Sequence, residues 1–307
     1  MSKCSVIILN WNGAEMLRRY LPSVVKGNGE RLKVNGEGLQ VTEEVIVADN
    51  GSTDDSLKVL REEFPGVRTI VLDRNYGFAE GYNRAIDQVD SEYVVLLNSD
   101  VEVPEGWLEP LLRYMDEHPD VAAVQPKIHS WEHKERFEHA GAAGGFLNWL
   151  GYPYCRGRKL WHVEEDHGQY DSVAEVDWTS GACMCVRTSV YKELGGLDAS
   201  FFAHMEEIDL CWRMRNKGWR LMCIPESTVY HLGGGSLHYD NPRKNYLNHR
   251  NNLLMIRKNM HRPGLVLFLR FFLDYTAALF YLLQGRPKSC MAVYEARRDY
   301  HRMAKNK

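Results

Sequence analysis

Two short polar segments follow apolar runs and have residue types suited to chemistry. Asn98-Ser99-Asp100 comes directly after the apolar run Tyr93 to Leu97. A carboxylate at such a strand end can bind a divalent metal that neutralises a diphosphate. Asp49 stands in the same position at the start of Asp49-Asn50-Gly51-Ser52. Either aspartate could equally serve as an ordinary turn or helix cap.

A third acidic segment lies on an expected amphipathic helix, Met205 to Lys217. At 100° per residue, Glu206, Asp209 and Arg213 share a narrow polar stripe. Glu207 falls on the apolar side of the same helix. A carboxylate there is costly unless it lines a pocket or finds partners. The alternative is that Glu207 only begins the helix, where the helix dipole favours a negative charge.

His231 follows a strand-like segment and precedes Gly233-Gly234-Gly235-Ser236. Glycine lets the backbone approach a ligand closely, so a histidine beside such a loop is a candidate for metal or phosphate contact. Four basic residues come next, and they form either a set of phosphate contacts or a solvated helix face. They are Arg243, Lys244, Arg250 and Arg257.

The elements that must position these residues alternate between strand and helix. Strands are expected at residues 5–10, 44–49, 67–72, 93–97 and 121–127, and helices at 14–26, 55–64, 78–88 and 107–118. Apolar strands that alternate with helices indicate an α/β fold with a mostly parallel central sheet and helices on both faces. Ligands bind beyond the carboxyl ends of such strands. Those ends carry Asn10-Trp11-Asn12, Asp49, Asn75 and Asp100.

The second half of the chain has a different pattern. Residues 128–175 are rich in His, Gly, Trp and Tyr with little periodicity, which predicts a loop region with short hairpins suited to an acceptor site. A strand is expected at residues 176–186 and a short helix at 189–194.

Composition limits the class of protein. The 307 residues are 44% apolar and 26% charged, with a formal net charge of −3, which is typical of a soluble enzyme and argues against nucleic acid as a partner. Seven cysteines without a CxxC pair argue against a disulfide framework or a zinc ribbon and suit reduced thiols in a cytoplasmic protein. The first residues do not have the pattern of a signal peptide.

Six ordered blocks resemble those of family 2 glycosyltransferases, nearest the bacterial rhamnosyltransferase-like branch, over residues 4 to 260. The blocks are ILNWNG, EVIVADNGSTDDS, NYGFAEGYNRA, VVLLNSDVEV, SGACMCVRTSVYKELGGLDASFFAHMEEIDLCWRMRNKGW and VYHLGGGS. The resemblance implies a GT-A fold, a nucleotide-diphosphate-sugar donor, Mg²⁺ or Mn²⁺ as cofactor, and inversion at the anomeric carbon. It also implies dTDP-rhamnose or a UDP-sugar as donor and a growing, lipid-linked surface glycan as acceptor.

The same resemblance divides the chain into a glycosyltransferase domain at residues 1–260 and a helical extension at residues 261–307. Within the domain, residues 1–127 form the nucleotide-sugar-binding half and residues 128–260 the acceptor and catalytic half. The main alternative is a non-catalytic nucleotide-sugar-binding module that keeps the fold. A nucleotidyltransferase is disfavoured because Asn10-Trp11-Asn12-Gly13 is not a glycine-rich, basic phosphate loop.

The resemblance also implies roles for individual residues. Glu207 matches the general base, where many members have Asp, and Asp100 and His231 match the metal site. Asn98 stands where many members have Asp, which leaves it to hydrogen-bond the ribose or the sugar. The expected donor-binding residues are Asn10, Asn12, Asp49, Asn75, Asn98 and Asp100, and the expected supports of the acceptor side and its helix are Glu206, Asp209 and Gly181.

One apolar stretch near the C-terminus, Gly264 to Leu283, has the length of a membrane-spanning helix. Arg270 and Asp274 lie near its middle and on one face, and each would be costly at the bilayer centre. Two interpretations remain: the helix packs on the enzyme with this pair together, or it lies in the interface of the membrane. Basic residues on both sides favour contact with the cytoplasmic leaflet, which makes a peripheral location on the inner face of the membrane the expectation.

Overall fold

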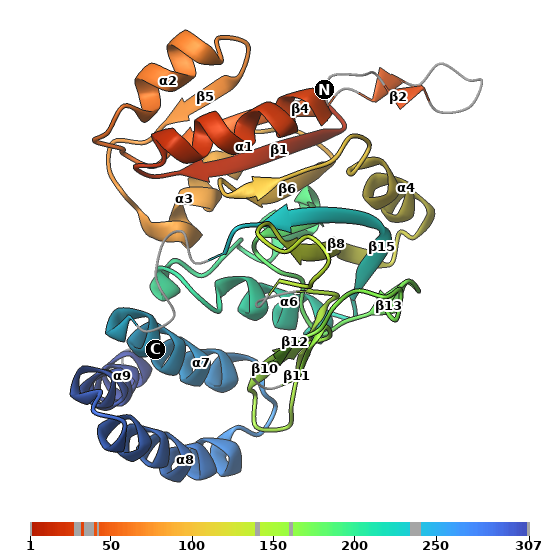
Figure 1. The fold of residues 1–307 in the computed structure, drawn as a ribbon. Coiled ribbons are helices and arrows are strands. Elements are labelled where there is room, and N and C mark those ends of the chain that lie inside the picture. Colours follow the sequence, from red (N-terminus) through yellow and green to blue (C-terminus); the bar gives the residue numbers. More distant parts are fainter. Residues whose placement is uncertain are drawn as a thin grey trace.

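The computed structural model describes residues 2–27, 32–33, 40–41, 43–138, 142–159, 162–233 and 241–305. Most of the expected polar loop at residues 27–42, and the end of the glycine loop from residue 234, lie outside the described residues. Within them, the order of elements follows the alternation of strand and helix that the sequence predicts (Figure 1).

A nine-stranded sheet runs through the molecule in the order β13-β15-β8-β14-β6-β1-β4-β5, with β7 paired to β15 (Figure 1). Its strands are β1 (Cys4–Asn10), β4 (Glu43–Asp49), β5 (Arg68–Val71), β6 (Tyr93–Asn98), β7 (Val101–Glu102), β8 (Val121–Ser130), β13 (Ala174–Glu175), β14 (Cys183–Arg187) and β15 (Arg220–His231). The N-terminal four, β6-β1-β4-β5, are all parallel. The α/β prediction is confirmed. Antiparallel pairing begins at β14, which is antiparallel to both β6 and β8, whereas β8 and β15 are parallel.

Helices cover both faces of this sheet because its central strands are apolar on both sides. In β1, Ile7 packs into one core cluster and Val6 and Ile8 into the other. The first cluster includes residues of α3 (Gly77–Ile86), α5 (Thr188–Glu193) and α6 (Glu206–Asn216), and the second includes residues of α1 (Ala14–Gly27), α2 (Ser56–Glu63) and α4 (Glu109–Glu117).

Short hairpins form in the second half of the chain, as predicted for residues 128–175. They pair β9 (Gly145–Leu147) with β10 (Pro153–Cys155) and β11 (Arg158–Lys159) with β12 (His162–Val163). A further short pair, β2 (Leu32–Lys33) with β3 (Gln40–Val41), lies near the first helix.

The strand expected at residues 176–186 is wrong in its first part, since only Cys183–Arg187 joins the sheet. Trp178 pairs with Gly145 of a hairpin instead of with a strand of the sheet. Their backbones exchange hydrogen bonds at 3.1 and 3.2 Å, and a Cβ atom at Gly145 would lie 2.0 Å from the Trp178 ring. The backbone N–H of Ser180 then donates to the side chain of Gln125 instead of to a neighbouring strand. Residues 176–182 therefore cross the sheet edge as an irregular segment.

Three helices follow the sheet: α7 (Pro242–Asn259), α8 (Gly264–Leu283) and α9 (Pro287–Lys305). Figure 1 shows α7 between α6 and α8, so the C-terminal helices form a layer at the end of the molecule away from β5. The 3-10 turn η1 (Ala199–Phe201) lies between α5 and α6.

Candidate active site

The carboxyl ends of β1, β4 and β6 bring three of the predicted polar segments to one edge of the sheet. Across the chain, β7 pairs with the end of β15, which places Val101 opposite His231, and the Leu232 N–H donates to the Asp100 carbonyl oxygen at 3.1 Å. Asp100 and His231, which are 131 positions apart in the sequence, are thereby held side by side. The edge of the sheet predicted to bind ligand is thus built from strand ends alone.

Asn10 and Asp49 form a buried pair at the first of these ends. The Asn10 side-chain amide donates to Asp49 Oδ2 at 3.0 Å, and the Ser52 N–H donates to Asp49 Oδ1 at 2.9 Å. Asn12 also holds this turn, because its Oδ1 accepts a hydrogen bond from the Thr53 N–H at 2.7 Å. Asp49 is wholly buried, so a nucleobase would reach it only after these neighbours shift.

Asn75 lies on the opposite side of the same turn. Its Oδ1 accepts from the Gly77 N–H at 2.8 Å and from the Asn50 amide at 3.2 Å. Asn50 also accepts from the Tyr76 N–H, and sequence reasoning did not select it. The Asp-Asn-Gly turn was the sequence signal that could have pointed to Asn50. In the structure, Gly51 of this turn has a φ of +72°, and a Cβ atom there would lie 2.5 Å from the Arg74 backbone.

Trp11 is another residue that sequence reasoning did not select. Its side chain is 55% exposed beside Asn10 and Asn12, although aromatic residues of this size are usually buried. An exposed ring at this edge can stack on a planar ligand.

Asp100 and His231 form the centre of the site. Their Oδ1 and Nε2 atoms lie 3.1 Å apart, and the Asn98 amide is 3.4 Å from the same nitrogen. The other ring nitrogen, Nδ1, lies 3.8 Å from Glu138 Oε1. Burial opposes charge on both groups, but the opposite charges outweigh it: the pKa of Asp100 lies below its usual value, and Asp100 and Glu138 raise the pKa of His231 to about 10.

These residues fit a divalent metal that shares its remaining ligands with a diphosphate. No cluster of three or more acidic, His or Cys side chains suited to a metal occurs in the described part of the chain. Mg²⁺, however, is usually held by one or two carboxylates together with phosphate oxygens. Glu138 stands behind the far nitrogen of His231, in the place where a carboxylate commonly orients a metal-binding histidine.

Glu206 and Glu207 begin α6 and are both enclosed. The Oε2 atom of each is buried without a hydrogen-bond partner. Burial and the neighbouring charge of Glu207 raise the pKa of Glu206 well above its usual value, and burial raises the pKa of Glu207. A Glu207 carboxylate with few hydrogen bonds and a raised pKa is suited to accept a proton near neutral pH.

Gly181 connects Glu207 with the Asp100 segment. A Cβ atom at Gly181 would lie 3.6 Å from the Cγ of Glu207. Its neighbour Ala182 accepts a hydrogen bond from the Asn98 N–H at 3.0 Å. Because residue 181 is a glycine, no side chain at this position separates Glu207 from the Asn98 to Asp100 segment.

The turn before α6 has an unusual backbone. Phe202, His204 and Met205 have positive φ values of 66°, 69° and 73°, a conformation that is costly for side chains with a Cβ atom. Asn251 of α7, which is wholly buried, holds this turn. Its amide donates to the carbonyl oxygens of three residues, Phe201, Ala203 and His204, at 3.0, 2.9 and 2.8 Å.

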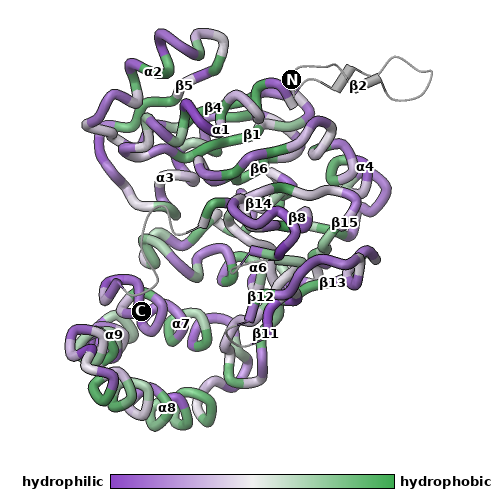
Figure 2. The backbone as a smooth tube through the Cα atoms, viewed as in Figure 1, coloured by the Kyte–Doolittle hydropathy of each residue, from purple (hydrophilic) through white to green (hydrophobic). Residues whose placement is uncertain are grey.

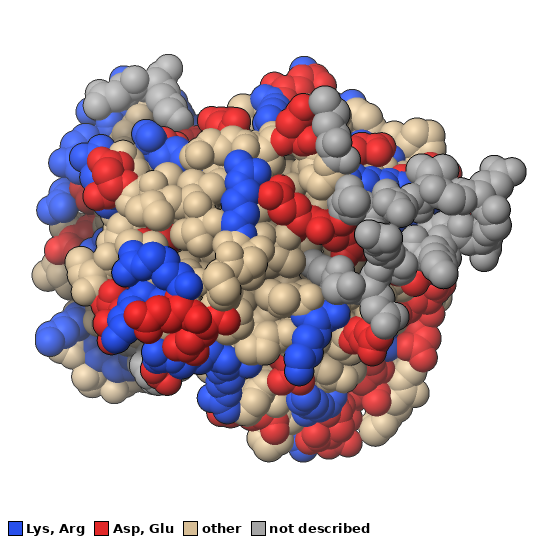
Figure 3. All heavy atoms as spheres, turned by 90° about the horizontal axis from the view of Figure 1, so that it is seen from above, with Lys and Arg blue, Asp and Glu red and all other residues tan. Residues whose placement is uncertain are grey.

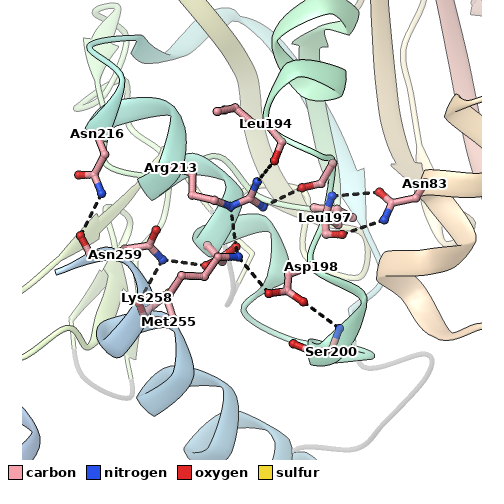
Figure 4. Close-up of polar contacts among 12 residues, drawn as sticks. Asn83, Leu194, Leu197, Asp198, Ser200, Arg213, Asn216, Met255, Lys258 and Asn259 are labelled. Atoms are coloured by element: carbon pink, nitrogen blue, oxygen red, sulfur yellow. Dashed lines mark hydrogen bonds and ion pairs between the residues drawn. The ribbon is translucent and has the colours of Figure 1, made fainter. Parts of the chain in front are cut away.

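Asp209 anchors α6 to α7 through Lys258 and Asn259, which Figure 4 labels. Its carboxylate accepts from Arg213 Nε at 2.8 Å, from Lys258 Nζ at 2.8 Å and from the Asn259 amide at 2.7 Å. Arg213 in turn donates to the carbonyl oxygens of Leu194 and Gly196. The three residues of the predicted polar stripe therefore have different surroundings. Asp209 and Arg213 join this network, and Glu206 lies buried beside Glu207.

The four basic residues after His231 have different partners. Arg250 donates to the carbonyl oxygens of Ser200 and Phe201, Arg257 donates to that of Ala304, and Arg243 stacks over the Phe202 ring. Lys244 is the one whose charge acts on His204 and Glu138. Lys244 is half-buried, and burial lowers its pKa although the charge of Glu138 opposes that shift.

Comparison with known families identifies the chain. The model described as "Glycosyl transferase family 2" matches residues 5–193, which is more than half of the sequence. The chain belongs to glycosyltransferase family 2. Among the relatives of this glycosyltransferase is the N-acetylglucosaminyl-diphospho-decaprenol L-rhamnosyltransferase of Mycobacterium tuberculosis, 30% identical over 203 residues. That alignment covers 61% of this chain and 66% of the relative, a little under two thirds of its length.

A second relative is the rhamnosyltransferase WbbL of Escherichia coli, 26% identical over 72% of this chain and 84% of that protein. Solved structures show the fold of this glycosyltransferase. GalNAc-T7 with UDP, GalNAc and Mn²⁺ superposes with a TM-score of 0.63 at 16% identity, over 98% of this chain and 55% of that one. The mannosyltransferase PcManGT of Pyrobaculum calidifontis, with GDP-Man and Mn²⁺, superposes with a TM-score of 0.58 at 14% identity, over 99% of this chain and 79% of that one. The fold is GT-A.

Proposed function

We propose that this family 2 glycosyltransferase transfers a sugar, with inversion, from a nucleoside-diphosphate donor to a hydroxyl group of a glycan. The observation that carries the proposal is the shared edge at Gly181 and Ala182, which borders both the Asp100–His231 pair and Glu207. A donor diphosphate beside Asp100 would then have its anomeric carbon near an enclosed carboxylate. The names of the relatives favour dTDP-rhamnose over a UDP-sugar.

In this mechanism Asp100 and His231 would hold Mg²⁺ or Mn²⁺, and the residues around Asn10, Asn12, Asp49 and Asn75 would hold the nucleoside. Asn98 hydrogen-bonds the ribose or the sugar. When bound, the metal neutralises the charge that develops on the leaving diphosphate. Lys244, enclosed beside His204 and Glu138, adds a positive charge to the same region.

Glu207 accepts the proton of the acceptor hydroxyl group as its oxygen attacks the anomeric carbon from the face opposite the diphosphate. This displacement inverts the anomeric configuration. The strained turn at Phe202 to Met205, held by Asn251, fixes where the base lies. Asp209 and Gly181 support this side of the site.

The proposed acceptor is a lipid-linked surface glycan, and the enzyme works at the cytoplasmic face of the membrane. One relative is named for transfer to N-acetylglucosaminyl-diphospho-decaprenol and another for O-antigen biosynthesis.

A panel of dTDP-, UDP- and GDP-sugars tests the proposal. We expect one donor to raise the melting temperature in a manner that depends on Mn²⁺ or Mg²⁺, and to release nucleoside diphosphate when a glycan acceptor is added. Donor binding without acceptor-dependent release, over a panel of acceptors, would instead support the non-catalytic binding module.

A further inference from the structure

Helix α8 presents a continuous apolar face to solvent. It is the one helix of the described residues that is long and apolar enough to cross a membrane, yet little of it is buried. Figure 2 shows this hydrophobic run at the end of the molecule formed by the C-terminal helices. The exposed residues are Leu265, Phe268, Phe271, Phe272, Leu273, Tyr275, Leu279, Phe280, Leu282 and Leu283, together with Met291 and Tyr294 of α9. We call these residues the α8 face.

The opposite side of α8 is polar at its centre and packs on the enzyme. Arg270 and Asp274 are 1% and 0% exposed, with Arg270 Nη2 3.4 Å from Asp274 Oδ1. Arg297 of α9 and His249 of α7 complete the cluster around Asp274. A helix held in this way cannot turn these charges toward lipid without losing their partners, so α8 lies along the surface of the domain with one side outward.

Charge around the α8 face is distributed as an anionic surface would require. Residues 261–305 contain eight Lys and Arg against three Asp and Glu, although the whole chain has a net charge of −3. Of the three acidic residues, Asp274 and Asp299 are buried. Exposed Arg262 and Lys288 lie just beyond the two ends of α8. By contrast, Figure 3 shows acidic and basic side chains interspersed on the face seen from above Figure 1.

We propose that the α8 face inserts into the interface of an anionic bilayer, with Arg262 and Lys288 at the headgroups. Aromatic and leucine side chains on one side of a helix, with basic residues around them, are the composition of an interfacial helix. A second copy of the chain could also cover an apolar face, but such an interface would not need a basic rim. The proposal rests on the proposed function only in that a lipid-linked acceptor lies in the same membrane.

The docked helix is connected to the catalytic turn through α7. Arg270 hydrogen-bonds the side chain of Asn252, whose amide donates to the Gly151 carbonyl oxygen at 2.7 Å. The next residue, Asn251, holds the turn that leads into Glu207. Membrane contact therefore fixes the orientation of the acceptor side of the site relative to the bilayer.

The test is co-sedimentation of the full chain with vesicles of phosphatidylcholine, with and without 30% phosphatidylglycerol, in the absence of donor and acceptor. The variant Phe272→Glu with Leu279→Glu places two charges in the α8 face. The control, Val25→Glu with Val71→Glu, adds the same charges at exposed apolar positions of α1 and β5. A third variant, Arg262→Glu with Lys288→Glu, reverses the charges at the ends of α8.

We expect the full chain and the control to bind anionic vesicles, and the α8-face variant to lose more than about tenfold in partitioning. The charge-reversal variant should lose binding to anionic vesicles by a similar factor, as should 1 M salt. Equal pelleting of the α8-face variant and the control would overturn the proposal. So would a full chain that stays in solution with vesicles and forms dimers by light scattering that the α8-face variant does not. Because no substrate is present, these outcomes are independent of whether sugar transfer itself is found.

Discussion

At the residue scale, Glu207 differs from an exposed glutamate in its surroundings. Burial raises its pKa above the ordinary value of 4.5. Because the ionised form accepts the proton, turnover should rise with pH through the pKa of Glu207. We expect the acid limb of the pH profile of kcat, at saturating donor, to have its midpoint clearly above 4.5. A midpoint at or below that value would show that another group limits the reaction.

Under the proposed mechanism, metal use depends on Asp100. Asp100→Ala would remove one of the two proposed protein ligands, and we expect metal-dependent turnover to fall at least about 100-fold, since charge stabilisation by a metal amounts to several kcal/mol. Asp90→Ala, an exposed residue with the same change in charge, is the control. Both variants should melt like the parent. Full activity of Asp100→Ala in the presence of EDTA would refute the assignment.

Local patterns marked several of these residues as candidates, and the family resemblance then selected between their alternatives. The period of a helix alone placed Glu207 on the apolar side of α6, and strand ends alone placed Asp49 and Asp100 at one edge. Asn251 and Glu138 could not be predicted in this way. Their contacts join segments 48 and 93 positions apart, and no periodic pattern records such distant contacts.

At the element scale, the turn before α6 depends on α7. Asn251→Ala would remove an amide that donates to three carbonyl oxygens. That of Phe201 also accepts from Arg250, but those of Ala203 and His204 would lose this donor, so we expect the free energy of unfolding to fall by about 2–4 kcal/mol. The strained turn should relax, and kcat should fall more than the KM for the donor changes. Urea unfolding and steady-state kinetics measure the two effects.

Asn252→Ala is the matched control for this prediction. Asn252 is the next residue of α7 and is also buried, but it donates to Gly151 and accepts from Arg270, away from the turn. We expect a loss of stability of similar size with kcat nearly unchanged per folded molecule. An equal fall in kcat for both variants would show that Asn251 acts through general stability alone.

Elements were predicted well where the hydrophobic period was long. Helices and strands of the first 127 residues lie within two residues of their expected bounds at most ends. Residues 176–182 failed because the contact that decides them, Trp178 on Gly145, is made with a distant hairpin. The apolar run that contains Trp178 predicts a strand, and only the structure shows the contact with Gly145 that keeps this part of the run out of the main sheet.

At the scale of the whole molecule, the cluster around Asp274 joins all three C-terminal helices. Asp274→Ala would leave Arg270 and Arg297 buried without their carboxylate, and we expect a loss of about 3–5 kcal/mol in the free energy of unfolding, measured in urea. Although burial opposes it, His249 and the two arginines hold the pKa of Asp274 below its usual value. Its contribution should therefore be present at neutral pH and lost as the pH falls through that lowered pKa. A variant as stable as the parent at pH 7 would contradict this account.

The predicted boundary at residue 260 falls between α7 and α8. It remains a prediction, and the packing bears on how to test it. Because α7 contacts α6 on one side and α8 and α9 on the other, removing residues 261–307 would uncover a helix that also holds the catalytic turn. Point variants on the surface of α8 are therefore a cleaner test than truncation.

The most direct test of the account is acceptor-dependent release of nucleoside diphosphate by Glu207→Gln and Glu206→Gln, with donor affinity measured in parallel. Burial and the charge of Glu207 raise the pKa of Glu206 well above its usual value, which favours its neutral form, so a neutral amide should replace it with little effect. Glu207→Gln should lose about 10²–10⁴-fold in turnover, the range of general-base catalysis, with unchanged donor affinity. Near-parental turnover of Glu207→Gln, or a loss found only in Glu206→Gln, would contradict the account.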